Sequence, residues 1–164
     1  MIVVSDSSPL LNLAIIGQLN LLQQLYGSVI IPQAVHEELV VKGAGMPGAE
    51  SIGTASWIVV EEAMDRVLVA ALQTQLDFGE AEAIVLAIES SADLLLLDER
   101  KARTVAAHLK LHFTGLLGLL VEAKQKNYIV AIKPVLDALM NQARFWVSPE
   151  LYKHVLEQVG ESTA

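Results

Sequence analysis

The sequence contains no cysteine, which excludes disulfide bonds, thiolate metal sites and thiol nucleophiles. It also lacks a long apolar run. Although 53% of the residues are hydrophobic and the mean hydropathy is +0.47, no stretch approaches the 18 or so apolar residues that a membrane span needs. The N-terminus has no basic segment, and its short apolar start ends at Ser5, so we expect no signal peptide. These absences together predict a soluble, cytoplasmic protein.

Basic residues are scarce as well. The chain has 11 Lys and Arg against 19 Asp and Glu, a net charge of −8 and a pI near 4.9. This balance argues against tight nonspecific binding of nucleic acid through a generally basic surface. A polyanionic substrate would need local help, either from divalent cations held by clustered acids or from a few well-placed Lys and Arg.

Short apolar, β-branched segments alternate with helical patterns along the chain. We expect strands at 2–5, 28–32, 57–62, 93–97 and 111–113. Helices are expected at 8–27 with a break at Gly17, and at 32–43, 64–75, 79–90, 99–109, 115–126, 131–143 and 149–159. The glycine-rich stretch 43–50 is expected to be a flexible loop.

This alternation predicts an α/β fold, a three-layer α/β/α sandwich with a central, mostly parallel sheet. The four leucines at 94–97 favour a strand buried on both faces, as in such a sheet. A chain of 164 residues suits one domain, so we expect residues 1–164 to form a single unit with the helices at 131–159 as an extension.

Two of the expected strands end on an acid, since "IVVSD" stops at Asp6 and "LLLLD" at Asp98. Ligands of parallel sheets bind beyond the carboxyl ends of the strands, where both acids lie. Each also has a simpler interpretation. Asp98 suits the N-cap of a helix that begins at Glu99, and Asp6 suits a turn, because Ser8 before Pro9 is the better N-cap for the first helix.

Three glutamates extend this set. Glu38 stands four residues before Lys42, the spacing of an exposed ion pair. Glu80 and Glu82 fall in the first turn of a helix, where the helix dipole favours acids. Each interpretation is sound for one residue, but these acids and the strand-end aspartates are also expected to converge on one edge of the sheet.

Carboxylates that are held close together repel one another and tend to take up protons unless a cation lies among them. Oxygen ligands without His or Cys favour Mg²⁺ or Mn²⁺ over zinc. Such an ion can activate a water nucleophile and stabilise charge on a phosphoryl oxygen. The acidic set therefore suits phosphodiester hydrolysis.

Five stretches, taken in order, resemble the PIN-domain superfamily, and more narrowly a prokaryotic branch of unknown function related to VapC-type toxins. The similarity covers nearly the whole chain, and the ordered set is specific. The stretches are "VVSDSSPLLNLAIIGQLNLL", "VIIPQAVHEEL", "LDFGEAEAIVLAIE", "LLLLDERKARTVAAHLKLHFTGLLGLLVEAK" and "FWVSPELYKHVLEQVGE". The resemblance implies a PIN-like version of the predicted fold.

The resemblance also implies a site. The family's four acids, which hold metal and carry catalysis, fall on Asp6, Glu38, Glu80 and Asp98. The third of these is usually an aspartate that opens a helix 18 residues before the strand-end acid; here a glutamate takes its place, with Glu82 as a nearby alternative. The implied activity is that of a Mg²⁺- or Mn²⁺-dependent ribonuclease, often the toxin of a toxin–antitoxin pair and often a homodimer. Its implied partners are RNA and a cognate antitoxin.

Further residues are secondary candidates. Ser8 and Thr114 match small hydroxyl residues near the family's site, although each also suits a helix cap. Arg100 and Lys101 follow Asp98 and are placed either to meet phosphate or to be solvated at the surface.

Three other patterns carry less weight. Phe145 and Trp146 suit a base-stacking platform, but a packing or dimer contact of the C-terminal helix is the more usual use of such residues. His108 and His112 have helical metal-ligand spacing, but the helix is expected to end between them. The glycines of "GAGMPG" do not follow a strand, so they do not predict dinucleotide binding.

Three functions are consistent with this sequence. The first is a metal-dependent ribonuclease. The second is a binding module that keeps the fold but has lost efficient catalysis, which the glutamate at position 80 and the acidic charge motivate. The third is a phosphatase or another small-substrate hydrolase that uses the same acids.

Overall fold

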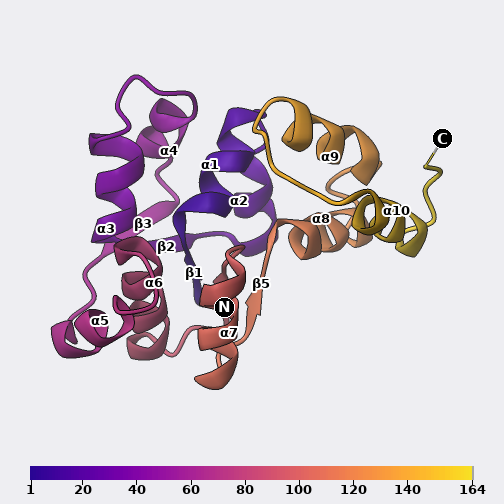
Figure 1. Cartoon of the computed structure of the whole chain (residues 1–164). Helices are drawn as coiled ribbons and strands as arrows, with labels where there is room; N and C mark the ends of the chain where they lie inside the picture. The colour runs from indigo at the N-terminus through magenta and orange to yellow at the C-terminus, as the bar shows by residue number, and fades with distance from the viewer. Residues whose placement is uncertain (164) are drawn as a thin grey trace.

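The computed structural model describes residues 1–163; Ala164, the last residue of the predicted domain, lies outside the described residues. In this part of the chain, five parallel strands form one sheet in the order β3-β2-β1-β4-β5 (Figure 1). The strands are β1 (Val3–Ser5), β2 (Val29–Pro32), β3 (Ile58–Glu61), β4 (Leu94–Leu96) and β5 (Phe113–Thr114). The prediction of a mostly parallel central sheet is confirmed.

Helices connect the strands and follow the last one. They are α1 (Ser7–Ile15), α2 (Asn20–Tyr26), α3 (Gln33–His36), the π-helical segment η1 (Glu37–Val41), α4 (Ala49–Thr54), α5 (Arg66–Leu72), α6 (Phe78–Glu89), α7 (Arg100–His108), α8 (Leu116–Gln125), α9 (Ile132–Asn141) and α10 (Pro149–Gln158). None of the described helices is long and apolar enough to cross a membrane.

The sequence did not predict α4, whose first residues lie in the stretch that was expected to be a flexible loop. Gly48 precedes the helix with a φ of 88°, a left-handed conformation that residues with a side chain adopt at a cost. A Cβ atom at this position would also lie 3.0 Å from the Cβ of Ala14 in α1. Gly48 therefore turns the chain into α4 and lets it approach α1 closely.

The side chains of the central strands alternate between two apolar clusters. Val3 and Leu96 belong to the cluster that contains α1, α2, α8, α9 and α10, whereas Val4, Leu95 and Leu97 belong to the cluster that contains α5, α6 and α7. Because successive strand residues point to opposite faces, both faces of the sheet are covered. The predicted three-layer α/β/α sandwich is confirmed.

The C-terminal helices α9 and α10 contribute to the first cluster, in which Leu136, Leu139 and Leu156 are fully buried. In Figure 1 these helices lie beside α8, on the side of the molecule away from α3 and α5. The apolar core that supports β1 therefore continues into the C-terminal helices.

Glu161, just after α10, joins this region to α8 and α9. Its carboxylate accepts hydrogen bonds from the Nζ of Lys124 (2.7 Å) and from the backbone N–H groups of Ile132 (2.7 Å) and Lys133 (3.0 Å). Ala131, the N-cap residue of α9, has no side-chain oxygen, so the distant carboxylate satisfies two N–H groups that the start of a helix leaves free. Burial raises the pKa of Glu161, but these hydrogen bonds outweigh it and hold the pKa below its ordinary value.

We therefore expect Glu161→Gln to lower the free energy of unfolding at pH 7 by about 1–3 kcal/mol, because the amide cannot accept these bonds as an anion does. A carboxyl group with a lowered pKa stabilises the fold above its ordinary pKa and loses this effect as the pH falls through the lower, folded-state pKa. The difference between variant and parent should therefore shrink in acid. Urea unfolding at neutral and acidic pH measures it.

The matched control is Glu157→Gln. Glu157 is exposed on α10, and its ion pair with Lys153 is long, with 3.9 Å between the Oε1 and the Nζ. We expect its free energy of unfolding to stay within about 0.5 kcal/mol of the parent. Equal effects of the two substitutions would show that Glu161 does not anchor α9.

Candidate active site

The candidate site lies at the carboxyl ends of β1 and β4, which are neighbours in the middle of the sheet. From β1 the chain builds the sheet outward through β2 and β3, and it then returns to add β4 and β5 on the other side of β1. Such a reversal of strand order is where open α/β sheets form ligand-binding crevices. Asp6 and Asp98 follow the two strands at this point.

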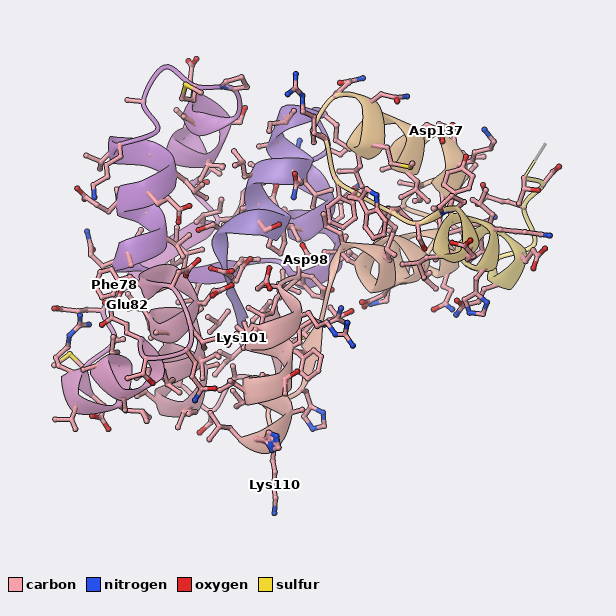
Figure 2. All side chains as sticks on the ribbon, viewed as in Figure 1. Phe78, Glu82, Asp98, Lys101, Lys110 and Asp137 are labelled. Carbon is pink, nitrogen blue, oxygen red and sulfur yellow. The ribbon has the colours of Figure 1, made fainter. Side chains whose placement is uncertain are left out.

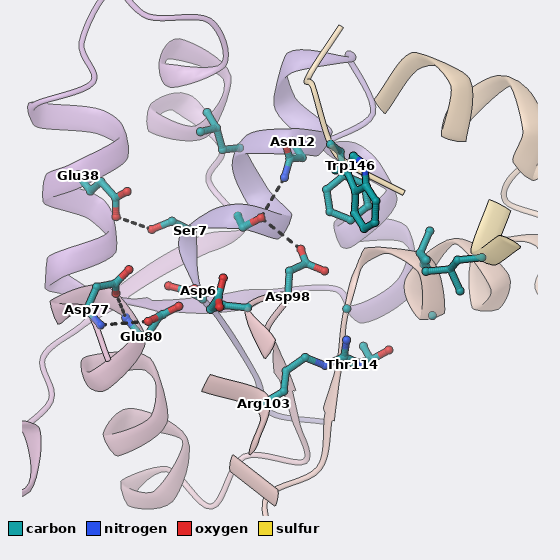
Figure 3. A pocket seen from close by; sticks show the side chains of 18 residues that line it. Asp6, Ser7, Asn12, Glu38, Asp77, Glu80, Asp98, Arg103, Thr114 and Trp146 are labelled. Carbon is teal, nitrogen blue, oxygen red and sulfur yellow. Dashed lines mark hydrogen bonds between the residues drawn. The ribbon is translucent and has the colours of Figure 1, made fainter. Parts of the chain in front are cut away.

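A pocket of about 700 Å³ opens at this edge (Figure 3). In the described residues, its charged lining consists of six carboxylates and one cation: Asp6, Glu38, Asp77, Glu80, Asp98, Glu99 and Arg103. The structure thus brings the four predicted acids together from four separate segments of the chain. Their catalytic role stays a prediction.

Asp6 is held in place by the backbone. The prediction that Ser8 caps the first helix is wrong, because α1 begins at Ser7 and Asp6 is its N-cap residue. Among the described residues, the side chain of Asp6 forms no capping hydrogen bond, whereas its backbone N–H donates to the carbonyl oxygen of Leu96 (3.0 Å). The main chain thereby extends the pairing of β1 with β4 by one residue and leaves the carboxyl group in the pocket.

Burial makes ionisation of Asp6 unfavourable. With only 6% of its surface exposed, its pKa rises from 3.8 to about 7, chiefly because burial disfavours the charged form. A hydrogen bond from the backbone N–H of Ser7 acts in the opposite direction, and the negative charges of Asp77, Glu80 and Glu38 raise the pKa further. Burial and like charges therefore act together on Asp6.

Glu38 lies on η1, where the helix widens by one residue per turn. The N–H of Lys42 donates to the carbonyl oxygen of Glu37, five residues earlier (2.8 Å), a pattern that is often found at functional sites. The Oε2 of Glu38 accepts a hydrogen bond from the Ser7 hydroxyl (2.7 Å; Figure 3). Within residues 1–163 no ion pair joins Glu38 to Lys42, so the surface-pair interpretation is wrong.

Glu80 forms a capping box with Asp77 at the start of α6. The Asp77 carboxylate accepts from the N–H of Glu80 (2.7 Å), and the Glu80 carboxylate accepts from the N–H of Asp77 (3.0 Å). Burial raises the pKa of Glu80, the bond to Asp77 opposes this, and the charges of Asp77, Glu99 and Glu38 raise the pKa further. Sequence reasoning missed Asp77, although an acid three residues before a glutamate at a helix start is the signal of a capping box.

Glu82, the predicted alternative to Glu80, lies outside this pocket. It is 2% exposed, and its carboxylate accepts from the Nη1 of Arg66 (2.6 Å) and from the N–H of Ala34 (2.9 Å). Figure 2 shows Glu82 near Phe78, well away from Asp98. Two residues apart on a helix, Glu80 and Glu82 point in different directions, so Glu80 is the acid that α6 contributes to the pocket.

Asp98 does not cap α7, because that helix begins at Arg100 with Glu99 as its N-cap residue. Instead, its Oδ1 accepts from the N–H of Leu116 at the start of α8 (2.8 Å), and its Oδ2 accepts from the Ser8 hydroxyl (3.3 Å). Burial raises the pKa of Asp98, although these two bonds and the charge of Arg103 oppose the rise.

Ser8 links α1 to the site. Its hydroxyl donates to Asp98 and accepts from the side-chain amide of Asn12 (2.9 Å). A Cβ atom at Gly115 would lie 2.6 Å from the Oδ1 of Asp98, so glycine leaves the space that this carboxylate occupies. Both Asn12 and Gly115 line the pocket, and the sequence carried no signal for either.

Arg103 is the basic residue of the pocket. Arg100, which the sequence suggested, is exposed, and the described lining holds Arg103 instead, one turn further along α7. The guanidinium carbon of Arg103 lies 5.3 Å from the centroid of the Phe113 ring. Thr114 lines the pocket as predicted, but Gly115 is the N-cap residue of α8, so the interpretation of Thr114 as a cap is wrong.

The aromatic pair also lies in this pocket. Phe145 is partly buried and packs against the apolar cluster that contains α1, α2, α8, α9 and α10, which agrees with the helical-packing interpretation. Trp146 is 80% exposed and, like Phe145, belongs to the pocket lining. The histidine pair is exposed, with His108 as the last residue of α7 and His112 beyond it.

The donor set has the chemistry of a site for a hard divalent cation. The groups whose charges raise the pKa of Asp6 are all carboxylates, and the pKa values of Asp6, Glu80 and Asp98 are all raised. The Oδ1 of Asp6 and the Oε2 of Glu38 both lie within 3.6 Å of the point where a Cβ atom of Gly79 would be. As the side chains stand, however, no three acids or histidines within residues 1–163 are close enough to hold one ion.

The raised pKa of Asp6 generates a prediction for the protein without metal. Between about pH 4 and pH 7 the folded chain keeps a proton on Asp6 that the unfolded chain releases, so the stability falls as the pH rises through this range and then levels off. Asp6→Asn removes the ionisable group. We expect the variant in EDTA to decline less over this range and to be more stable than the parent at pH 8, by about 1–3 kcal/mol.

Urea unfolding at a series of pH values measures this effect. Glu61→Gln is the matched control, because Glu61 is exposed at the carboxyl end of β3 and outside the pocket. This control should follow the parent at every pH. An Asp6→Asn variant that is less stable than the parent at pH 8 would contradict the account of Asp6.

Comparison with known proteins agrees with this geometry. A search of curated proteins gave no match. The model of a family described as a PIN domain matches residues 2–161, a range that contains all the described strands and helices. PIN domains have a nuclease-type fold and typically use a divalent metal ion. The narrower resemblance to VapC-type toxins stays a prediction. Because the match covers nearly the whole chain, this protein belongs to the PIN domain family.

Proposed function

We propose that this protein is a metal-dependent ribonuclease that hydrolyses phosphodiester bonds of RNA. The proposal is carried by one observation: Asp6, Glu38, Glu80 and Asp98, which are far apart in the sequence, line a single pocket at the switch point of the sheet. Membership of a family with a nuclease-type fold supports it. RNA as the substrate comes from the resemblance rather than from the geometry.

The four acids are proposed to hold one or two Mg²⁺ or Mn²⁺ ions. When bound, such an ion supplies positive charge that activates water and stabilises the oxygens of the phosphoryl group. It would also neutralise the carboxylates whose ionisation burial and mutual repulsion now oppose. Since the side chains do not yet converge on one point, ion binding requires some of them to rotate.

The surrounding residues have distinct proposed roles. Ser7 and Ser8 orient Glu38 and Asp98 through their hydroxyls. Asp77 positions Glu80 through the capping box. Arg103, the one cation in the described pocket lining, is placed to contact a phosphate of the substrate.

We further propose the role that the resemblance to VapC-type toxins implies, with a cognate antitoxin, a homodimer and a cytoplasmic location. Co-expression with the product of a neighbouring small open reading frame tests the antitoxin, and light scattering of the purified protein tests the dimer. A chain that stays monomeric and binds no such product would leave the nuclease without a toxin role.

The central prediction concerns catalysis. Purified protein should cleave single-stranded RNA with Mg²⁺ or Mn²⁺ and not with EDTA. Asp6→Asn and Asp98→Asn should each lower the cleavage rate at least about 100-fold, because each removes a metal-binding oxygen, while circular dichroism shows that the variants fold. Glu61→Gln again serves as control, as an exposed acid at the same edge of the sheet but outside the pocket. If both aspartate variants cleave like the parent, the ribonuclease assignment is wrong.

Metal binding provides a separate prediction. A ligand that binds only the folded chain raises its stability in proportion to the logarithm of its concentration once the site is saturated. Millimolar Mg²⁺ or Mn²⁺ should therefore raise the melting temperature of the parent, and it should raise that of Asp6→Asn much less. Differential scanning fluorimetry with and without EDTA measures the difference, and Glu61→Gln should respond like the parent.

The second candidate is a binding module that keeps the fold without efficient catalysis. It is favoured by the capping box of Glu80, which engages the Oε1 of the carboxylate that would have to reach the metal. Calorimetry separates the two candidates, because the absence of any divalent binding at millimolar concentrations would favour the binding module. Hydrolysis of nitrophenyl phosphate instead of RNA would point to a phosphatase.

A further inference from the structure

Trp146 leaves 80% of its surface exposed although the chain on both sides of it is anchored. Phe145 packs against the apolar cluster that contains α1, α2, α8, α9 and α10, and its N–H donates to the carbonyl oxygen of Leu139 (2.9 Å). Val147 is 5% exposed. The backbone of α9 and the apolar cluster therefore hold the indole in solvent, and its exposure does not come from a free loop.

The ends of this segment are fixed as well. Arg144 turns the chain after α9 with a φ of 55°, a left-handed conformation that costs energy in a residue with a side chain. On the other side, the Ser148 hydroxyl accepts from the N–H of Leu151 (3.1 Å), and Pro149 is the first residue of α10. A strained turn and a capped helix start thus set the position of Trp146.

The indole belongs to the wall of the acidic pocket. Figure 3 shows Trp146 beyond Asn12 and Asp98, away from Glu38. Phe145 and the side chains of Leu117 and Leu151 also line this pocket. The pocket therefore combines carboxylates with an exposed aromatic ring, and an indole in water leaves a large apolar area unburied.

We infer that Trp146 is a stacking platform for an unpaired base of the RNA whose phosphate lies at the carboxylates. This inference rests on the proposed function. The pocket, at about 700 Å³, lies in the size range of sites that enclose small ligands, so a base beside a phosphate fits its volume. Stacking requires an open base face, which single strands, loops and bulges offer.

The acidic charge of the protein makes stacking an important source of RNA affinity. With a net charge of −8, and with Arg103 as the single cation in the described pocket lining, contacts between phosphates and basic residues supply little affinity. Stacking on an aromatic ring is an uncharged interaction that every base can make. The ring therefore favours single-stranded RNA over duplex RNA and holds the base with little regard for sequence.

Fluorescence tests the contact directly. The sequence has two tryptophans, and Trp57 packs against the core outside the pocket, so Trp57→Phe leaves Trp146 as the sole reporter. Combined with Asp98→Asn, which keeps the RNA intact, this protein is titrated in Mg²⁺ with single-stranded RNA and with an abasic ribose-phosphate oligomer of equal length and charge. We expect saturable quenching by the RNA and none by the abasic oligomer.

Affinity gives a second measurement. In the Asp98→Asn protein, Trp146→Ala should weaken binding of fluorescently labelled RNA about tenfold, as measured by anisotropy, whereas Trp146→Phe should bind nearly as tightly as the parent. Tyr128→Ala is the matched control, since Tyr128 is an exposed aromatic residue outside the pocket. It should leave the affinity unchanged.

The outcomes separate this inference from the proposed function. Equal RNA affinity with and without the indole, or equal quenching by the abasic oligomer, overturns the stacking contact and would indicate that the ring serves a protein partner. Quenching by RNA together with the tenfold loss supports it. Failure of the ribonuclease proposal appears elsewhere, as an absence of Mg²⁺-dependent cleavage by the unmutated protein.

Discussion

The burial of Asp6 at the end of β1, among carboxyl groups that repel one another, is the constraint around which this structure is arranged. Asp6 is nearly enclosed, and three other acids raise its pKa, so the ionised site opposes folding. Two well-packed clusters, one on each face of the sheet, supply the stability that tolerates this cost. A stability deficit concentrated in one pocket is typical of functional sites, where activity and stability impose different demands on the same residues.

Neutral donors keep these acids in position. Glu38 and Asp98 accept from serine hydroxyls, and Asp98 and Glu80 accept from backbone N–H groups at helix starts. None of these donors carries a full charge, so they orient the carboxylates without neutralising them. The buried Glu82 shows the contrast, because its partner is the guanidinium of Arg66 and its charge is thereby compensated. The pocket acids stay available for a cation, whereas Glu82 is a structural residue.

The sequence predicted the features that follow from the pattern of apolar residues, namely the strands, the helices and the buried faces. The apolar run that ends in Asp98 suited a strand covered on both faces, and the alternation of elements predicted that Asp6 and Asp98 share one edge of the sheet. Predictions failed where a tertiary contact decides the role of a polar group. Ser8 looks like a helix cap until Asp98, 90 residues away, takes its hydroxyl. Whether Arg100 or Arg103 faces the pocket depends on which side of α7 is turned toward it. The sequence does not fix this orientation, because it places the start of the helix only to within a residue or two.

The wide turn of η1 has a consequence for how this domain can vary. Each residue advances an α-helix by about 100°, and the five-residue hydrogen bond from Lys42 to Glu37 accommodates one residue more than a regular turn. Deleting one residue here would restore a regular helix, but it would rotate either Glu38 away from Ser7 or Leu39 out of the core. The contacts of Glu38 with Ser7 and of Leu39 with the core therefore fix the number of residues between the end of β2 and Gly43.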